Sequence, residues 1–147
     1  MILHHEIFTF SADYLVIVMK IMNILLKIGT SIVILALASY SIAVITEQIK
    51  HKISNLVLFF LTAGIILDIS ATVFMILGSS NTPFTLHGIM GYSSLGAMLA
   101  DTFILWRFRL KNGRDAEVAK GIHLFSRYAF SWWVLAFITG AVIAVSK

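Results

Sequence analysis

Two aspartates and one histidine lie where a chain of this composition has little need of them. Asp68 and Asp101 each fall inside a long apolar stretch, and His87 opens the second of these stretches. An ionised carboxylate at the centre of a bilayer costs about 2.5–3.5 kcal/mol on insertion scales. Because 59% of the residues are hydrophobic, the chain has cheaper side chains for such positions. We therefore expect these three residues to face a bundle interior, a partner side chain or a bound group.

The composition is that of an integral membrane protein. The chain has 147 residues, of which 12% are charged, whereas a soluble domain carries about twice that charge. Apolar stretches occur at about 24–46, 56–77, 85–108 and 122–145, each near the roughly 20 residues that cross a bilayer. Short connections between them predict an all-α, antiparallel four-helix bundle in one membrane domain, 24–147. These spans leave no room for a soluble catalytic domain.

The basic residues are sorted toward one side of the predicted spans. Most of the 11 lysines and arginines fall in the first and third connections or at the span ends beside them. They are Lys50, Lys52, Arg107, Arg109, Lys111, Arg114, Lys120 and Arg127. The positive-inside rule places these loops in the cytoplasm and both termini outside. The net charge of +4 is then explained by a solvated face on the lipid bilayer and predicts no nucleic-acid partner.

Residues 1–23 precede the first predicted span and do not fit its pattern. They lack the basic beginning and the small-residue cleavage site of a signal peptide. The apolar run Tyr14–Met22 is too short to cross a bilayer alone. Two interpretations remain: an interfacial helix that leads into the first span, or translated sequence upstream of the true start. Met19 and Met22 stand just before the span, so we favour the second interpretation.

Polar and small residues recur at helical spacing in the second and third spans, so each set shares one helix face. The sets are Gly64, Asp68, Ala71 and Met75 in the second span, and His87, Gly91, Ser94, Met98 and Asp101 in the third. Small residues let membrane helices approach closely, so a packing seam accounts for the glycines and alanines and would also permit a homodimer. Such a packing seam does not explain the two aspartates, because close helix packing requires no acidic side chain. Asp101 could instead hydrogen-bond to Trp132, pair with Arg127 or be protonated on burial.

Depth in the membrane decides which side chains can act together. At 1.5 Å per residue, Asp101 lies about 21 Å inward of His87, and His123 lies near the inner surface. His87 and His123 therefore cannot ligate one metal ion or one heme iron. At the outer level, His87 and Met75 could ligate a heme iron while Lys27 reaches a propionate. At the inner level a second candidate cluster consists of His51, Asp101, His123 and Arg127.

Three motifs resemble those of one known family. Thr85–Gly91 (Thr-Leu-His-Gly-Ile-Met-Gly) and Ile122–Ser126 (Ile-His-Leu-Phe-Ser) are similar to motifs of the heme-sensing membrane protein A (HsmA) family of small four-span bacterial proteins. Leu67–Thr72 resembles a stretch in the second span of that family. The resemblance covers about Leu25 to the end of the chain.

The resemblance implies a bacterial cytoplasmic membrane protein, not an enzyme, that binds heme b and sequesters or senses it, which limits heme and oxidant toxicity. It carries Asp68, His87 and His123 over as matching positions, with the two histidines as candidate iron ligands. Fourteen residues after His87, where the family has a second histidine, this chain has Asp101. That departure removes a strong axial ligand from the inner site and raises the weight on His87.

Two alternatives belong to other classes of protein. A small b-type cytochrome-like electron-transfer subunit would use the two histidine levels as separate redox sites. A small proton-coupled exporter would need an acid embedded in the first span, where the one acid is Glu47 at the predicted cytoplasmic edge. The sequence shows no Ser–His–Asp arrangement, phosphate-binding loop or His-Glu-x-x-His helix. It also has no cysteine, which excludes thiolate metal sites and a cysteine nucleophile.

Overall fold

The computed structural model describes residues 2–80, 84–113 and 116–146, with side chains from Tyr14 onward. Four helices follow one another in these residues, and no strand occurs among them. They are α1 (Ile2–Lys50), α2 (Asn55–Gly78), α3 (Leu86–Asn112) and α4 (Lys120–Val145). The predicted all-α class is confirmed for the described part of the chain.

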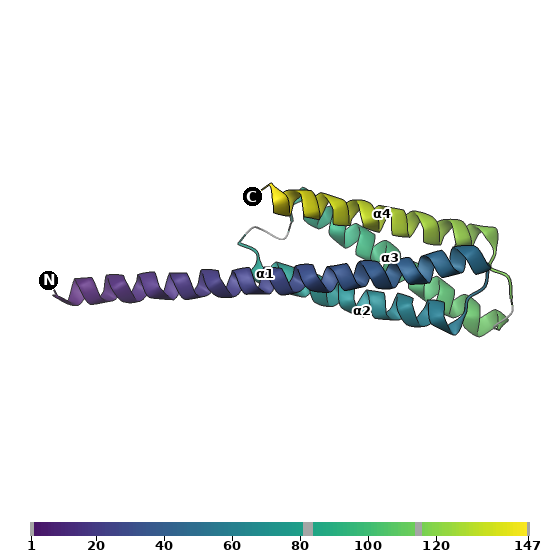
Figure 1. The fold of residues 1–147 in the computed structure, drawn as a ribbon, viewed down its shortest axis with the longest axis horizontal. Coiled ribbons are helices and arrows are strands. Elements are labelled where there is room, and N and C mark those ends of the chain that lie inside the picture. Colours follow the sequence, from purple (N-terminus) through teal and green to yellow (C-terminus); the bar gives the residue numbers. More distant parts are fainter. Residues whose placement is uncertain (1, 81–83, 114–115, 147) are drawn as a thin grey trace.

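Each of the four helices is long and apolar enough to cross a membrane. The helices α2 and α4 lie close to the predicted spans 56–77 and 122–145, and α3 continues beyond 108 to Asn112. The first helix differs most, since it begins at Ile2 and is continuous to Lys50. Its N-terminal part projects beyond the other helices in Figure 1. Residues 2–23, which the sequence analysis separates from the first span, are thus part of the same helix as that span.

Polar residues in the connections set the helix boundaries. The hydroxyl oxygen of Ser54 accepts a hydrogen bond from the Val57 backbone N–H at the start of α2. That of Thr85 accepts one from the Gly88 N–H at the start of α3, at 3.0 Å. Such N-caps satisfy donors that the first turn of a helix leaves unpaired.

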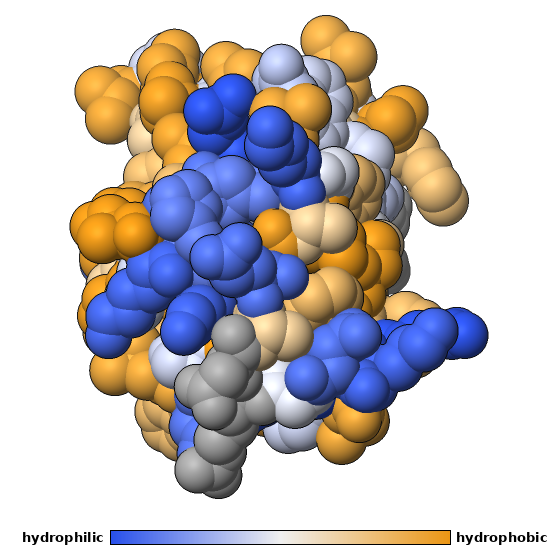
Figure 2. Space-filling view, turned by 90° about the vertical axis from the view of Figure 1, so that its right-hand side faces the viewer, coloured by the Kyte–Doolittle hydropathy of each residue, from blue (hydrophilic) through white to orange (hydrophobic). Residues whose placement is uncertain are grey.

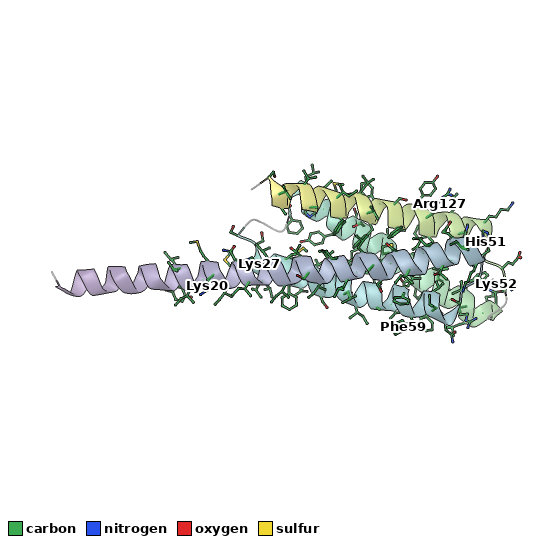
Figure 3. All side chains as sticks on the ribbon, in the orientation of Figure 1. Lys20, Lys27, His51, Lys52, Phe59 and Arg127 are labelled. Atoms are coloured by element: carbon green, nitrogen blue, oxygen red, sulfur yellow. The ribbon has the colours of Figure 1, made fainter. Side chains whose placement is uncertain are left out.

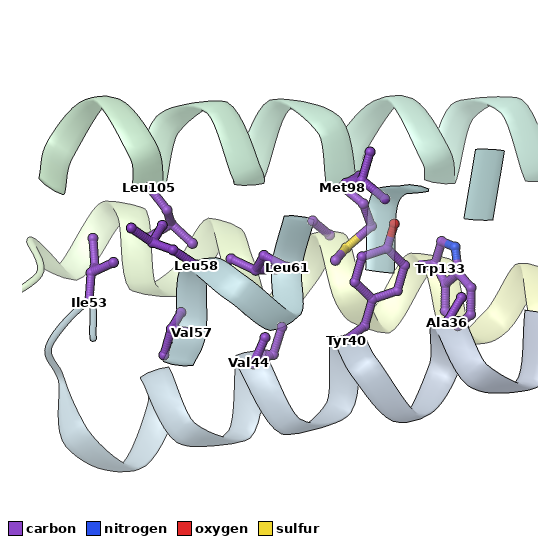
Figure 4. Close-up of a cluster of buried hydrophobic side chains, with 13 residues drawn as sticks. Ala36, Tyr40, Val44, Ile53, Val57, Leu58, Leu61, Met98, Leu105 and Trp133 are labelled. Carbon is purple, nitrogen blue, oxygen red and sulfur yellow. The ribbon is translucent and has the colours of Figure 1, made fainter. Parts of the chain in front are cut away.

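The helices run alternately in opposite directions, with α1 packed most extensively against α2, and α3 against α4 (Figure 1). Their shared interior contains buried side chains from all four helices, drawn in Figure 4. Among the largest are Tyr40, Leu61, Met98, Leu105 and Trp133. The buried core therefore extends along the axis of the bundle and contains side chains from all four helices.

Glycines bring α1 and α2 into close contact. A Cβ atom built on Gly64 would lie 2.5 Å from the Tyr40 ring, and one on Gly78 would lie 2.8 Å from the backbone of α1. Gly29 of α1 meets Met75 of α2 in the same way, at 2.9 Å. Only glycine allows these approaches, which is the packing role that the small-residue stripes predict.

One end of the bundle gathers hydrophilic side chains, shown facing the viewer in Figure 2. We call it the basic end. It holds the C-terminus of α1, the N-terminus of α2, the C-terminus of α3 and the N-terminus of α4 (Figure 1). His51, Lys52 and Arg127 all lie at or near it in Figure 3, and Lys27 lies toward the opposite end.

Candidate functional site

The basic end contains a buried acid that is paired with a histidine. Glu47, near the end of α1, is 1% exposed, and its Oε1 lies 2.7 Å from Nδ1 of His123 in the first turn of α4. The Gln48 amide nitrogen donates to Glu47 Oε2 at 2.8 Å and to the His123 carbonyl at 3.0 Å. Both carboxylate oxygens of Glu47 are therefore engaged, and α1 and α4 are joined at this end.

His51 lies directly against this pair. Its ring centroid is 4.7 Å from that of His123, with the two planes tilted by 46°. Its backbone φ is +51°, in the left-handed region that residues other than glycine seldom adopt. The His51 carbonyl accepts from the Val118 N–H at 3.0 Å, which attaches the connection after α3 to the end of α1. The predicted inner grouping of His51 with His123 is thus seen in the structure.

Asp101 is held by a different residue from those the sequence suggests. The Ser126 hydroxyl donates to Asp101 Oδ1 at 2.6 Å, and the aspartate is fully buried. Trp132 instead donates to the Ser93 hydroxyl at 3.0 Å. Arg127 lies over the ring of Tyr128 at 6.0 Å. The two predicted partners of Asp101 are therefore wrong, because the exposed side of α4 carries both of them.

One oxygen of Asp101 lacks a partner within the described part of the chain. Its Oδ2 is buried and makes no hydrogen bond to any described residue. Ser126 stands one turn after His123, so a single face of α4 contacts both Asp101 and Glu47. Two of the buried acids thus depend on α4 for their partners.

Asp68 sits in the middle of the bundle in a polar triad with two aromatic residues. Its Oδ2 accepts the indole N–H of Trp133 at 2.6 Å and the hydroxyl of Tyr40 at 3.3 Å. The two rings meet edge to face, with centroids 5.1 Å apart. The triad joins α1, α2 and α4, and it is the structural polar contact that the sequence left open for this acid.

His87 packs onto α4 near the end opposite the basic end. Its Nδ1 lies 3.1 Å from the Thr139 hydroxyl, which itself donates to the Ala136 carbonyl. Because that proton is committed to Ala136, Nδ1 of His87 is the donor in the contact. A Cβ on Gly140 would lie 2.8 Å from the His87 ring, so the ring rests on the α4 backbone.

The other half of the predicted outer site packs elsewhere. Met75 lies against Gly29 of α1, whereas His87 lies against α4. Each of the two side chains is thus part of a different helix contact. Among the described residues, no group of three or more histidine, aspartate or glutamate side chains is arranged to hold a metal ion.

Glu47 is the residue that sequence reasoning undervalued. The sequence places it at the predicted cytoplasmic edge of the first span, and the structure shows that it is buried. The signal was present, since Tyr40, Ala43 and Glu47 follow one another at steps of three and four residues and all three are buried. Ser126 carried a similar signal, since Ser126, Ala129 and Trp133 follow one another at steps of three and four residues and all three are buried.

Comparisons of the chain with protein-family models, with curated proteins and with solved structures found no significant match. The resemblance to the HsmA family therefore stays a hypothesis that rests on the three sequence motifs.

Proposed function

We propose that the protein is a heme-binding, multi-pass protein of the bacterial cytoplasmic membrane that sequesters or senses heme, with His123 as the axial ligand. The observation that carries the proposal is the 2.7 Å contact between His123 Nδ1 and Glu47 Oε1. A histidine that ligates a metal usually gives its second ring nitrogen to a carboxylate or carbonyl, which fixes the tautomer and makes the ligand more basic. Glu47 stands in that position.

The residues around His123 fit one imidazole ligand. With Nδ1 turned to Glu47, Nε2 makes no hydrogen bond to the described residues. The side chain is 22% exposed and can be reached from outside the bundle. His87 fits less well, because Nδ1 is bonded to Thr139 and the rest of the ring rests on Gly140. Bound heme b would supply the iron at this position.

The surroundings of His123 match the charge of a heme. Lys50, Lys52 and Lys120 stand at the same end of the helices, and the exposed Arg127 follows His123 by one turn. Heme carries two propionates, for which these cations are suitable partners. In the proposed orientation the basic end faces the cytoplasm and both termini face outward. Heme would then bind from the inner side of the membrane.

A hemin titration followed by absorption spectroscopy tests the proposal. Detergent-purified protein should give a saturable Soret band, and His123→Ala should abolish it. His87→Ala is the matched control and should keep the band. Glu47→Gln should weaken binding by about 10–100-fold, the usual effect of losing such a supporting carboxylate. A Soret band that persists in His123→Ala and disappears in His87→Ala would assign the ligand to the other end.

A second candidate, proton-coupled export, is favoured by one observation. Glu47, Asp68 and Asp101 are all buried, and among the described residues none of them lies within ion-pair distance of a lysine or arginine. Carboxyl groups placed in this way inside membrane bundles mark proton relays in transporters. The test is efflux of a fluorescent organic cation from proteoliposomes under a pH gradient. Transport that is lost in Asp68→Asn, in protein that binds no heme, would replace the first proposal by this one.

A further inference from the structure

A groove runs along the outside of α2 and α3 next to the basic end. Its volume is about 720 Å³, and Arg109 lines it together with both aromatic and polar residues. The lining includes Asn55, Phe59, Thr62, Trp106, Arg109 and Leu110. None of these residues belongs to the heme or proton sites discussed above.

Arg109 is the unusual residue of this groove. It is only 9% exposed, although an arginine at a helix end can usually extend into water. Its Nη2 donates to the Asn55 side-chain oxygen at 2.8 Å. Its Nη1 is buried and has no hydrogen-bond partner among the residues that the structure describes. A guanidinium that is charged, buried and only partly satisfied is costly, and it calls for a group that accepts its remaining donors.

The walls of the groove are apolar and open to the outside of the bundle. Phe59 is 67% exposed and Leu110 is 79% exposed. Trp106 lies between the two helices and donates its indole N–H to the Thr62 hydroxyl at 3.1 Å. Figure 3 shows Phe59 on the outer face of α2, pointing away from the bundle. A hydrocarbon chain would find a continuous apolar surface there.

Further cations stand beside the groove. Arg107 and Lys111 line an adjoining hollow that shares Trp106 and Leu110 with it. A negatively charged group at Arg109 would therefore lie in a positive field. This field and the apolar walls together complement a molecule with an anionic head and an acyl tail.

We propose that the groove binds an anionic phospholipid. The headgroup phosphate accepts hydrogen bonds from the Arg109 guanidinium, and an acyl chain lies along Phe59 and Leu110. Arginine suits this role because its planar set of donors matches phosphate oxygens in pairs. Basic pockets between membrane helices on the cytoplasmic side are known to take such headgroups. The proposal does not depend on heme binding.

The test uses the full-length protein in mixed micelles, with lipid retention measured by native mass spectrometry. Phosphatidylglycerol should be retained by the wild type and phosphatidylcholine should not. Arg109→Gln should lower retention of phosphatidylglycerol by about tenfold or more, because the variant loses the charge-assisted hydrogen bonds to the phosphate. Arg127→Gln is the matched control, because Arg127 is an exposed arginine at the same end of the bundle and lines neither hollow, and it should change retention by less than about threefold.

Two further arms keep the test decisive. If Arg109→Gln does not fold, Arg109→Lys preserves the charge but removes the paired donors, and it should still reduce retention. Inorganic phosphate added in excess should not displace the lipid, because the acyl chain contributes to binding. Equal retention by Arg109→Lys and the wild type, equal retention of the two lipids, or displacement by inorganic phosphate would overturn the proposal.

Discussion

Trp133 of α4 donates its indole N–H to the carboxylate of Asp68 in α2 across 2.6 Å, at the centre of the bundle. Trp133 is 3% exposed and Asp68 is 5% exposed, so the contact is shielded from solvent and lipid alike. The second donor to the same oxygen, the Tyr40 hydroxyl, is further away at 3.3 Å. The indole is therefore the main partner of this acid.

Replacing Trp133 by phenylalanine should destabilise the protein by about 1–3 kcal/mol, because Asp68 loses its closest donor while it stays buried. The measurement is thermal unfolding in detergent followed by circular dichroism. Trp132→Phe is the matched control. Trp132 is 41% exposed and donates to Ser93 on an exposed face, so its replacement should have a much smaller effect. Equal losses of thermal stability in the two variants would show that the hydrogen bond to Asp68 contributes no more to stability than the exposed one to Ser93.

The contact between Ser126 and Asp101 should show a rescue. Ser126→Ala removes the hydroxyl that donates to Asp101 Oδ1, and Oδ2 already lacks a partner among the described residues. We expect a loss of about 1–3 kcal/mol in unfolding free energy. Adding Asp101→Leu should recover most of it, because replacing both members of a buried polar pair by apolar groups is nearly neutral. A double variant that is less stable than Ser126→Ala would argue for a structural requirement for the acid.

Alanine substitutions of two glycines should have opposite effects on stability, because one glycine lies in a close helix contact and the other does not. Gly64→Ala places a methyl group 2.5 Å from the Tyr40 ring and should cost about 1–3 kcal/mol through overpacking. Gly96→Ala meets no atom within 4 Å and should stabilise α3 by up to about 1 kcal/mol through helix propensity. Unfolding in a denaturing detergent titration measures both. A Gly64→Ala variant that is as stable as the wild type would contradict the close approach of α1 and α2.

The orientation of the protein can be tested by single cysteines, since the chain has none of its own. Ser80 follows α2, and Asn112 ends α3 at the basic end; both side chains are exposed. A membrane-impermeant maleimide added to intact cells should label Ser80→Cys and leave Asn112→Cys unlabelled until the cells are lysed. The reverse pattern would invert the proposed topology and would place the heme ligand outside.

The sequence predicts the helices well because their signals are local. Long apolar stretches interrupted by short polar connections determine where α2 and α4 begin and end. The inward face of α3 is also readable, since Ser94, Met98 and Asp101 recur at helical spacing and all are buried.

The partners of the buried acids could not be predicted in the same way. They depend on how each helix is rotated and how deep it sits relative to its neighbours. Asp101 faces Ser126 because α4 presents that side of its first turns to α3. The spacing of polar residues along one helix does not determine which residue of the neighbouring helix forms a hydrogen bond with them. Glu47 was underestimated for a related reason, because burial at a helix end depends on the neighbouring helix.

The hydrogen bonds of the buried acids have a consequence for how the halves of the molecule recognise each other. The α1–α2 hairpin and the α3–α4 hairpin are joined by Glu47 with His123 and by Asp68 with Trp133. Apolar faces in lipid slide past one another with little preference, since the solvent is as apolar as they are. Two polar contacts at different depths leave one alignment in which both can form. The buried acids therefore make the docking of the two hairpins specific, because they select one depth and one rotation of each hairpin relative to the other. This role holds whatever further chemistry the acids support.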